Sequence, residues 1–332
     1  MDDGIRQVLA KYNELAKLIL DQKLDEMADK MEDVPKDSDE LSYEQYLQNL
    51  VMAETDEQMA LMEDEEDELL DGMSMRDYFA GLSVEELLDI QEYCAVNLDG
   101  KQPKSLTEAL IEKAEINDEV YEQLRTYAAK TIGGAAWTED ELKDEDKIFE
   151  IEFTKVKACL ELLIELRDGS MVAAILDRFL SYPETRDFVA DSIAGYVEAF
   201  PEVSVPFIIG KIEDNTDSGL TGPFEDLVII LSRIGKVTPS EDIYLTLKHA
   251  FRYMTNKIYA VICLMEYGDG RAIPMLKGYV NRNKDSIDRD LFYEIMSAVQ
   301  NLGGDISDIE DPFGDFDGKK NTPGAPNSKY RD

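Results

Sequence analysis

Apolar residues recur at helical spacing through most of the chain, and the pattern is clearest over residues 257–280. One face of each of two helices is predicted by Ile258, Val261, Ile262, Met265, Ile273, Leu276 and Val280. Gly268 predicts the end of the first helix and Asp269 a side-chain cap for the second. Pro274 falls in the first turn, where a missing N–H costs little. We expect two antiparallel helices joined by a short connection.

Weaker copies of this hairpin occur upstream. The second helices are predicted to begin near Met171, Ser204, Ser240 and Arg271, at spacings of 33, 36 and 31 residues. In one copy, 205–208 stands where 273–276 stands in the clearest hairpin. A single hairpin cannot bury both of its apolar faces, so copies with this irregular period predict stacked helix pairs, as in an α-solenoid.

The best copy resembles the short HEAT-like repeats first noted in phycobilisome lyases. The matching residues are Ala260, Leu264, Gly268, Asp269, Arg271, Ala272, Ile273, Pro274 and Leu276, and in a second copy Arg186, Ala190, Ile193, Val205, Pro206 and Ile208. The resemblance covers about 152–302. It implies an architecture of stacked helix pairs, and no lyase activity, because the family shares a scaffold and not a chemistry.

The N-terminal part is also predicted to be helical. An apolar stripe over 3–31 is interrupted at 33–40, and a second helix follows Ser42. Three capping boxes are predicted, in which a Ser or Thr is followed three residues later by Glu: Ser83 with Glu86, Ser105 with Glu108 and Thr138 with Glu141. Asn117 predicts a further helix start. The stretch 82–114 weakly resembles the SAP and Rho-N-terminal helical modules, some of which bind nucleic acid. Its carboxylates outnumber its lysines, which argues against phosphate binding here.

These patterns predict an all-α chain in three parts. The first is an acidic helical domain over 1–135, as one body or as two subdomains, 1–75 and 76–135. An α-solenoid of about four to five HEAT-like helix pairs is expected over 136–303, with the Gly133–Gly134 pair and Trp137 marking the boundary. We expect Trp137 to be a core or interdomain plug. The third part, 304–332, is rich in Gly, Pro and Asp and is expected to be a disordered tail. As an alternative, Phe313 and Phe316 could form a short linear docking motif in this part.

The charge is strongly negative and uneven. The 332 residues carry a formal charge of −38, and residues 1–150 contain 42 acidic and 14 basic residues, against 30 and 20 in the rest. Such a chain repels nucleic acid and anionic membranes and favours basic partners. It has no apolar run of about 18 residues, and its acidic start is not a signal peptide. Cys94, Cys159 and Cys263 are far apart in helical patterns, so we expect buried, reduced thiols and a cytoplasmic location.

No stretch predicts catalysis. The run 63–68 is dense in carboxylates, but neighbouring positions on a helix point apart, so a solvated face or loop is expected. Residues 214–225 fit a calcium loop poorly, because two of the three early ligands lack carboxylates and Pro223 sits in the second half. His249 is the only histidine and has no evident nucleophile, so a structural or surface role is expected. We therefore expect no catalytic, cofactor or metal site.

The function that fits these observations best is a non-enzymatic protein-interaction scaffold that binds a basic protein or peptide. The sequence does not specify which face binds. The alternatives are a nucleic-acid mimic and a nucleic-acid-associated HEAT-like protein. The latter needs a positive groove, for which the chain offers only scattered residues such as Lys236, Lys248, Arg252 and Lys257.

Overall fold

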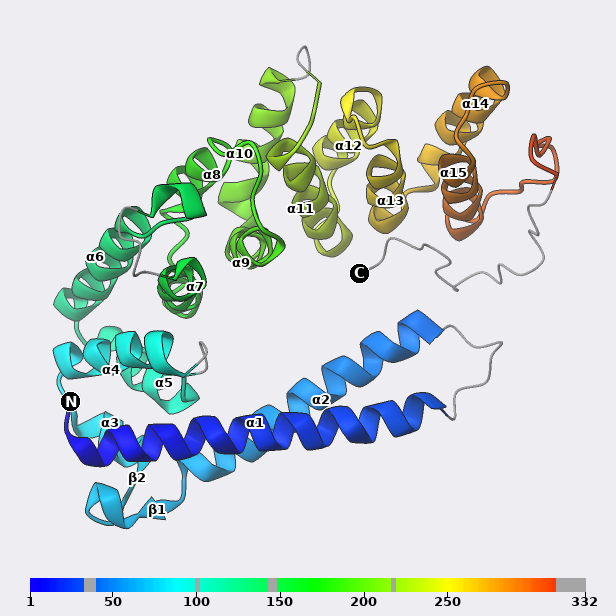
Figure 1. The fold of residues 1–332 in the computed structure, drawn as a ribbon. Coiled ribbons are helices and arrows are strands. Elements are labelled where there is room, and N and C mark those ends of the chain that lie inside the picture. The colour runs from blue at the N-terminus through cyan, green and yellow to red at the C-terminus, as the bar shows by residue number, and fades with distance from the viewer. Residues whose placement is uncertain (33–39, 99–101, 143–147, 216–218, 315–332) are drawn as a thin grey trace. The chain divides into compact units, whose positions relative to one another are not determined.

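The computed structural model describes residues 1–32, 40–98, 102–142, 148–215 and 219–314. These residues form fifteen α-helices, with one small two-stranded sheet (Figure 1). The predicted all-α class is confirmed. The interruption expected at 33–40 lies almost entirely outside the described residues. The chain divides into two compact units, Met1–Asp168 and Gly169–Asp332, here called unit 1 and unit 2.

Unit 1 holds the first seven helices and the sheet. They are α1 (Asp3–Glu32), α2 (Glu40–Glu63), β1 (Glu66–Asp67), the 3-10 turn η1 (Glu68–Leu70), β2 (Met73–Ser74), α3 (Met75–Gly81), α4 (Val84–Asn97), α5 (Lys104–Glu115), α6 (Asp118–Gly134), the 3-10 turn η2 (Glu139–Glu141) and α7 (Phe149–Glu165). β1 and β2 are antiparallel, with Glu66 opposite Ser74. One continuous core joins these elements, and the predicted stripe of α1 enters it through Ile5, Val8, Leu9, Tyr12, Ala16 and Ile19.

The boundary between the units lies after Asp168, later than the boundary expected at residue 135. α7, which was expected to open the solenoid, packs on α4 and α6 of unit 1. Trp137 is buried there as predicted for a core residue, and its indole N–H donates to the Ile132 carbonyl at 3.2 Å. Its ring meets Phe153 of α7 edge to face, with centroids 6.3 Å apart. The Gly pair therefore ends a helix within unit 1 and does not separate two domains.

Some of the predicted helix starts are confirmed and others are wrong. Ser83 and Glu86 form the capping box expected at α4, and Asn117 caps α6. The other two boxes were wrong. Ser105 lies inside α5, which begins at Lys104, and Thr138 makes no side-chain cap.

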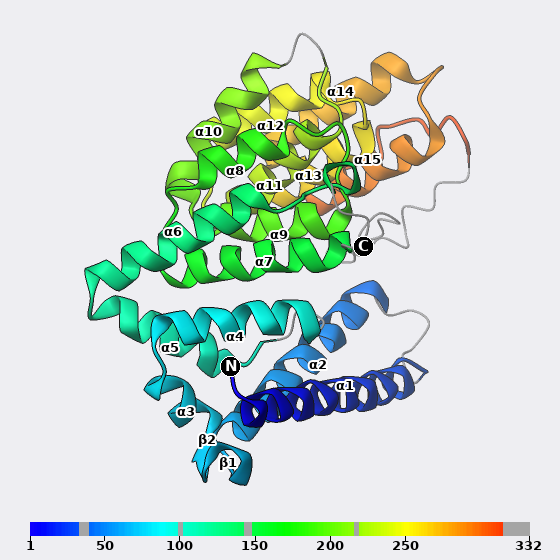
Figure 2. The ribbon, with the colours of Figure 1, turned by 60° about the vertical axis from the view of Figure 1, so that its left-hand side comes forward.

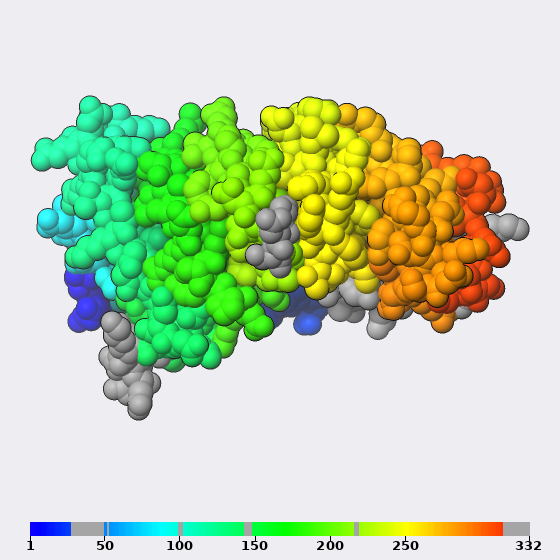
Figure 3. All heavy atoms as spheres, turned by 90° about the horizontal axis from the view of Figure 1, so that it is seen from above, coloured from blue at the N-terminus to red at the C-terminus, as the bar shows by residue number. Residues whose placement is uncertain are grey.

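Unit 2 consists of the last eight helices in two layers (Figures 1 and 2). One layer contains α8 (Val172–Phe179), α10 (Pro201–Asp214), α12 (Glu241–Tyr253) and α14 (Ile273–Asn283), and the other contains α9 (Asp187–Glu198), α11 (Pro223–Val237), α13 (Lys257–Tyr267) and α15 (Arg289–Asn301). Helices of the second layer pack in order, α9 on α11, α11 on α13 and α13 on α15, and each helix also contacts the other layer. In Figure 3, which views the molecule from above Figure 1, the colours of this unit run from green through yellow to orange in chain order.

The two helices predicted over 257–280 form, as α13 and α14, but α13 packs mainly on α11, α12 and α15, and α14 mainly on α15. Gly268 ends α13 in a left-handed conformation, with φ 82°, and the Asp269 carboxylate accepts from the Arg271 backbone N–H at 2.8 Å. A 3-10 turn, η4 (Gly270–Ala272), leads into α14, with Pro274 in the first turn. The copy upstream differs in register. α10 begins at Pro201, so Pro206 lies in the helix interior and not in the first turn.

Part of the segment expected to be a disordered tail belongs to unit 2. Residues 304–314 are described, and the Phe313 ring packs on α15, 5.7 Å from Phe292 and 6.1 Å from Tyr293 between centroids. The packing of Phe313 against two aromatic rings offsets the conformational entropy that this polar segment loses when it is ordered. Phe316 and the remainder, 315–332, lie outside the described residues.

Candidate functional site

An acidic cleft of about 900 Å³ opens within unit 1 between α1, α2, α5 and α7. Its polar lining consists of Tyr12, Thr55, Asp56, Glu57, Glu63, Gln102, Lys104, Thr107, Glu108, Glu112, Glu115, Glu161 and Glu165. Ala16, Met59, Ala60 and Ile111 supply the apolar part. Eight of these lining residues are Asp or Glu and only one is basic, so the cleft concentrates the negative charge of the chain.

Helical spacing brings the carboxylates to the cleft. Glu108, Glu112 and Glu115 stand four and three residues apart on α5, which places them on one face around Ile111. Glu161 and Glu165 are one turn apart on α7. Asp56 and Glu57 add a third wall from α2. Three helices thus present acidic rows to the same space.

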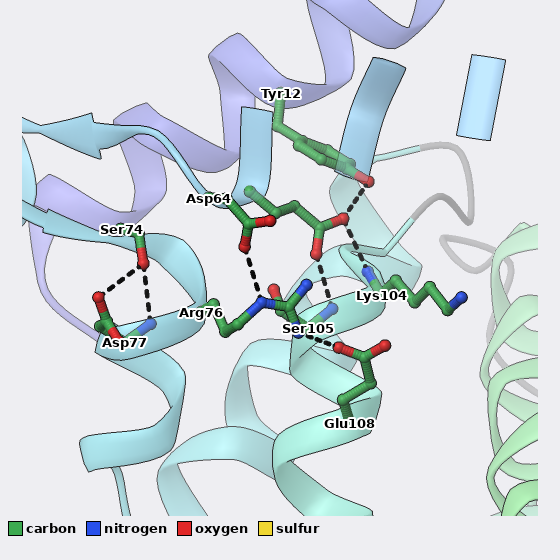
Figure 4. A network of polar contacts seen from close by, with 9 residues as sticks. Tyr12, Asp64, Ser74, Arg76, Asp77, Lys104, Ser105 and Glu108 are labelled. Atoms are coloured by element: carbon green, nitrogen blue, oxygen red, sulfur yellow. Dashed lines mark hydrogen bonds and ion pairs between the residues drawn. The ribbon is translucent and has the colours of Figure 1, made fainter. Parts of the chain in front are cut away.

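Glu63 lies beneath these rows and is buried. Its carboxylate accepts three hydrogen bonds, from the Tyr12 hydroxyl at 2.9 Å and from the backbone N–H groups of Lys104 at 2.9 Å and Ser105 at 2.7 Å. Figure 4 shows Tyr12, Lys104 and Ser105 around this group. The carboxylate therefore caps α5 from a distant part of the chain, at the positive end of the helix dipole. Burial, and then the charge of Glu63, raise the pKa of Tyr12, so its hydroxyl stays a donor.

One of the acidic walls is tied to the fold by an arginine. Arg76 of α3 pairs with Asp64, with Nε 2.7 Å from Oδ1, and also contacts Glu108 (Figure 4). Because one guanidinium is shared between two carboxylates, the charge of Glu108 is offset only in part. Glu161 has a distant partner, with 3.9 Å between its Oε1 and the Lys157 Nζ on the same helix.

The other wall residues have no cationic partner among the described residues. These are Asp56, Glu57, Glu112, Glu115 and Glu165. Like charges gathered around a concave surface reinforce one another's potential, because the low-dielectric walls focus the field. A cation that enters the cleft therefore meets several carboxylates at once.

The burial and capping role of Glu63 were not predicted from the sequence. The run 63–68 was expected to be solvated, and this holds for Asp64, Glu65, Glu66 and Glu68, but Glu63 is only 1% exposed. The spacing of the buried positions along α2 does indicate that Glu63 is buried. Val51, Thr55, Met59 and Glu63 follow one another at steps of four, and all four are buried. The same capping role explains why Ser105 does not cap α5.

The other residues considered from the sequence are scattered. Cys94, Cys159 and Cys263 are buried free thiols, and burial raises the pKa of each to about 12, so they are poor nucleophiles. His249 is half-buried on α12 with its ring 4.8 Å from that of Tyr253. The poor calcium loop at 214–225 is only partly described, since 216–218 fall outside the described residues.

Within the described ranges, no three His, Cys, Asp or Glu side chains are placed to hold a metal ion. No helix in the described part of the chain has the length and apolarity needed to cross a membrane. Comparisons with protein-family models, curated proteins and solved structures found no match.

Proposed function

We propose that the protein is a non-enzymatic interaction scaffold whose unit 1 cleft binds a basic segment of a partner protein. The observation that carries the proposal is the convergence of eight Asp and Glu residues on one cleft that contains a single lysine. A Lys- or Arg-rich segment would replace the repulsion between these side chains with attraction. Because the lining also includes Met59, Ala60 and Ile111, the aliphatic stems of such residues would find apolar contacts.

We also propose that unit 2 is a HEAT-like solenoid and that the chain acts in the cytoplasm. The sequential packing of its helix layers and the sequence resemblance over 152–302 support the first statement. The three buried, unpaired thiols support the second, because a reducing compartment preserves them.

The test compares two variants of equal charge change. In the cleft variant, Glu112, Glu115, Glu161 and Glu165 are replaced by Gln. In the control variant, Gln replaces Glu14 and Asn replaces Asp21, Asp25 and Asp89, which are exposed carboxylates of unit 1 outside the cleft. The probe is a fluorescent fifteen-residue peptide rich in Lys and Arg, and its anisotropy gives the affinity at low and at moderate salt.

We expect the cleft variant to bind at least tenfold more weakly and the control to stay within about twofold of the wild type, since each charge pair contributes a few tenths to 1 kcal/mol. Wild-type affinity should also fall as salt is added. Equal losses in the two variants would show attraction to bulk negative charge, and the cleft would lose its assigned role.

A further inference from the structure

The unit 1 cleft carries negative charge that the described part of the chain leaves unmatched. Five of its carboxylates have no cationic partner among the described residues, and Lys104 is the one basic residue of its lining. Carboxylates gathered in this way repel one another until a cation approaches them. A basic segment of the chain itself is therefore a candidate occupant, and the sequence contains one.

Segment 318–331, which follows the described residues, is basic in an otherwise acidic chain. Its sequence, GKKNTPGAPNSKYR, contains four basic and no acidic residues, whereas the whole chain carries a formal charge of −38. The stretch 271–284 has the same balance, but it makes up most of η4 and α14, and Arg271 and Lys277 there pair with carboxylates. Segment 318–331 therefore provides four positive charges that no carboxylate within it offsets.

Two basic residues of this segment match the spacing of two acidic residues of the cleft. In an extended backbone, side chains two residues apart project to the same side, about 6.6 Å apart, and Lys329 and Arg331 have this separation in sequence. On a helix, residues four apart are separated by about 6 Å along the axis, as Glu161 and Glu165 are on α7. Lys329 and Arg331 can therefore each meet one carboxylate of this row.

Tyr330 projects to the opposite side of such an extended backbone. The apolar lining of the cleft comes partly from Met59 and Ala60 of α2 and from Ile111 of α5. A tyrosine ring buries a large apolar area, makes favourable contacts with a methionine sulfur, and keeps its hydroxyl at the wet edge of a site. The order basic, aromatic, basic thus fits a cleft with carboxylates from α7 and apolar side chains from α2 and α5.

We propose that segment 318–331 of the same molecule occupies the unit 1 cleft through Lys329, Tyr330 and Arg331, and that a basic partner must displace it. This regulation rests on the proposed function, because both concern the same cleft. A tethered segment acts at an effective concentration on the order of mM, so even a weak contact competes with a free ligand. The tether formed by 315–329 can extend at most about 54 Å from the end of the described residues.

The first test measures competition with the basic fluorescent peptide introduced above, at low salt and with the whole chain. In one variant Gln replaces Lys329 and Arg331. In the matched control Gln replaces Lys319 and Lys320, so both variants lose two positive charges. We expect the first variant to bind the peptide about three- to tenfold more tightly than the wild type, because its internal competitor is weakened. The control should change the affinity less than twofold.

The second test locates the segment. A nitroxide is attached to the Ser328→Cys variant, and the three native thiols do not compete for it because they are buried. We expect the nitroxide to broaden the methyl NMR signals of Met59 and Ile111, and the four-Gln cleft variant to abolish this broadening. When nitroxide-bearing chains are mixed with isotope-labelled chains that lack the nitroxide, the broadening should be absent, because the contact lies within one molecule.

Three results would overturn the proposal. Equal affinity changes in the two Gln pairs would show a general effect of charge. Unbroadened signals of Met59 and Ile111 would show that the cleft does not hold the segment, and broadening in the mixed sample would assign the cleft to the segment of a second copy. The proposed function fails separately, if the four-Gln cleft variant binds the basic peptide as the wild type does.

Discussion

At the scale of single residues, Glu63 is a buried acidic residue that joins three helices of unit 1. It is buried, ends α2, caps α5 and receives the hydroxyl of Tyr12 from α1. A charged group becomes tolerable in the interior when donors satisfy its oxygens, and here three do. Its neighbours in the run face solvent, so one carboxylate of the run has a different role from the rest.

Glu63→Ala should destabilise the protein by about 3 kcal/mol, because it leaves two backbone N–H groups and one hydroxyl without an acceptor. Tyr12→Phe should cost about 1 kcal/mol, since it removes only one of the bonds. Glu65→Ala, at the exposed position two residues on, should change stability by less than about 0.5 kcal/mol. Denaturant unfolding measures all three, and equal effects at 63 and 65 would contradict the capping role.

Asp226 makes the stability of unit 2 depend on pH. Burial, followed by the nearby charges of Glu225, Asp187 and Asp191, raises the pKa of Asp226 from 3.8 to about 6. A carboxyl whose folded pKa is raised stabilises the protein at low pH, and this contribution is lost as the pH rises through about 6.

Asp226→Asn should therefore stabilise the protein at pH 7.5, by about 1–2 kcal/mol after allowance for partial exposure. The advantage should shrink as the pH is lowered to 5, because the wild-type carboxyl then becomes protonated in the folded state. Urea midpoints of both proteins at pH 5, 6 and 7.5 measure this. A difference that does not change with pH would exclude Asp226 as its source.

At the scale of elements, close helix packing in unit 2 depends on Gly235. A Cβ at this position of α11 would lie 2.7 Å from Cδ2 of Tyr267 on α13 and 2.8 Å from Cγ2 of Ile243 on α12. Three helices thus meet at a glycine. Gly195 of α9 is also helical, but a Cβ there would have no neighbour within 4 Å.

The same substitution should have opposite effects at these two glycines. Gly235→Ala should cost about 1–3 kcal/mol, because overpacking outweighs the better helix propensity of alanine. Gly195→Ala should add about 0.5–1 kcal/mol, since only propensity changes. Thermal unfolding of the two variants tests this. Stabilisation by both would mean that α11, α12 and α13 have room to separate.

Local signals explain which elements could be predicted. The hairpin over 257–280 contains its own stop, cap and proline within 24 residues, and each acts on its neighbours in sequence. The cap of α5 could not be found in this way, because Glu63 precedes its two backbone donors by 41 and 42 residues. The acidic cleft was missed for a similar reason. Its rows are readable on each helix, but only the tertiary packing of unit 1 brings them to one space.

At the scale of the whole molecule, the dominant property is the charge of −38. Surface ion pairs such as Lys11–Asp67 and Arg271–Glu241 offset little of it, since exposed pairs contribute about 0–1 kcal/mol each. Mutual repulsion of the remaining carboxylates lowers the stability of the compact state.

Added salt should therefore raise the melting temperature. Screening shortens the range of repulsion from about 30 Å at 0.01 M to about 8 Å at 0.15 M ionic strength. We expect calorimetry to give a higher melting temperature at 0.15 M NaCl than at 0.01 M. Salt added above 0.15 M should raise the melting temperature by less than this first step does. A decrease would mean that attractive ion pairs, which salt weakens, dominate over repulsion.

The long-range cap on α5 also bears on how unit 1 opens. The first turn of a helix normally frays by itself, as the locally capped start of α4 at Ser83 can. The amides of Lys104 and Ser105 are held instead by a carboxylate on α2, so they are released only when α2 leaves α5. Their hydrogen exchange should therefore follow the concerted unfolding of unit 1, and these two amides at the start of α5 become reporters of that event.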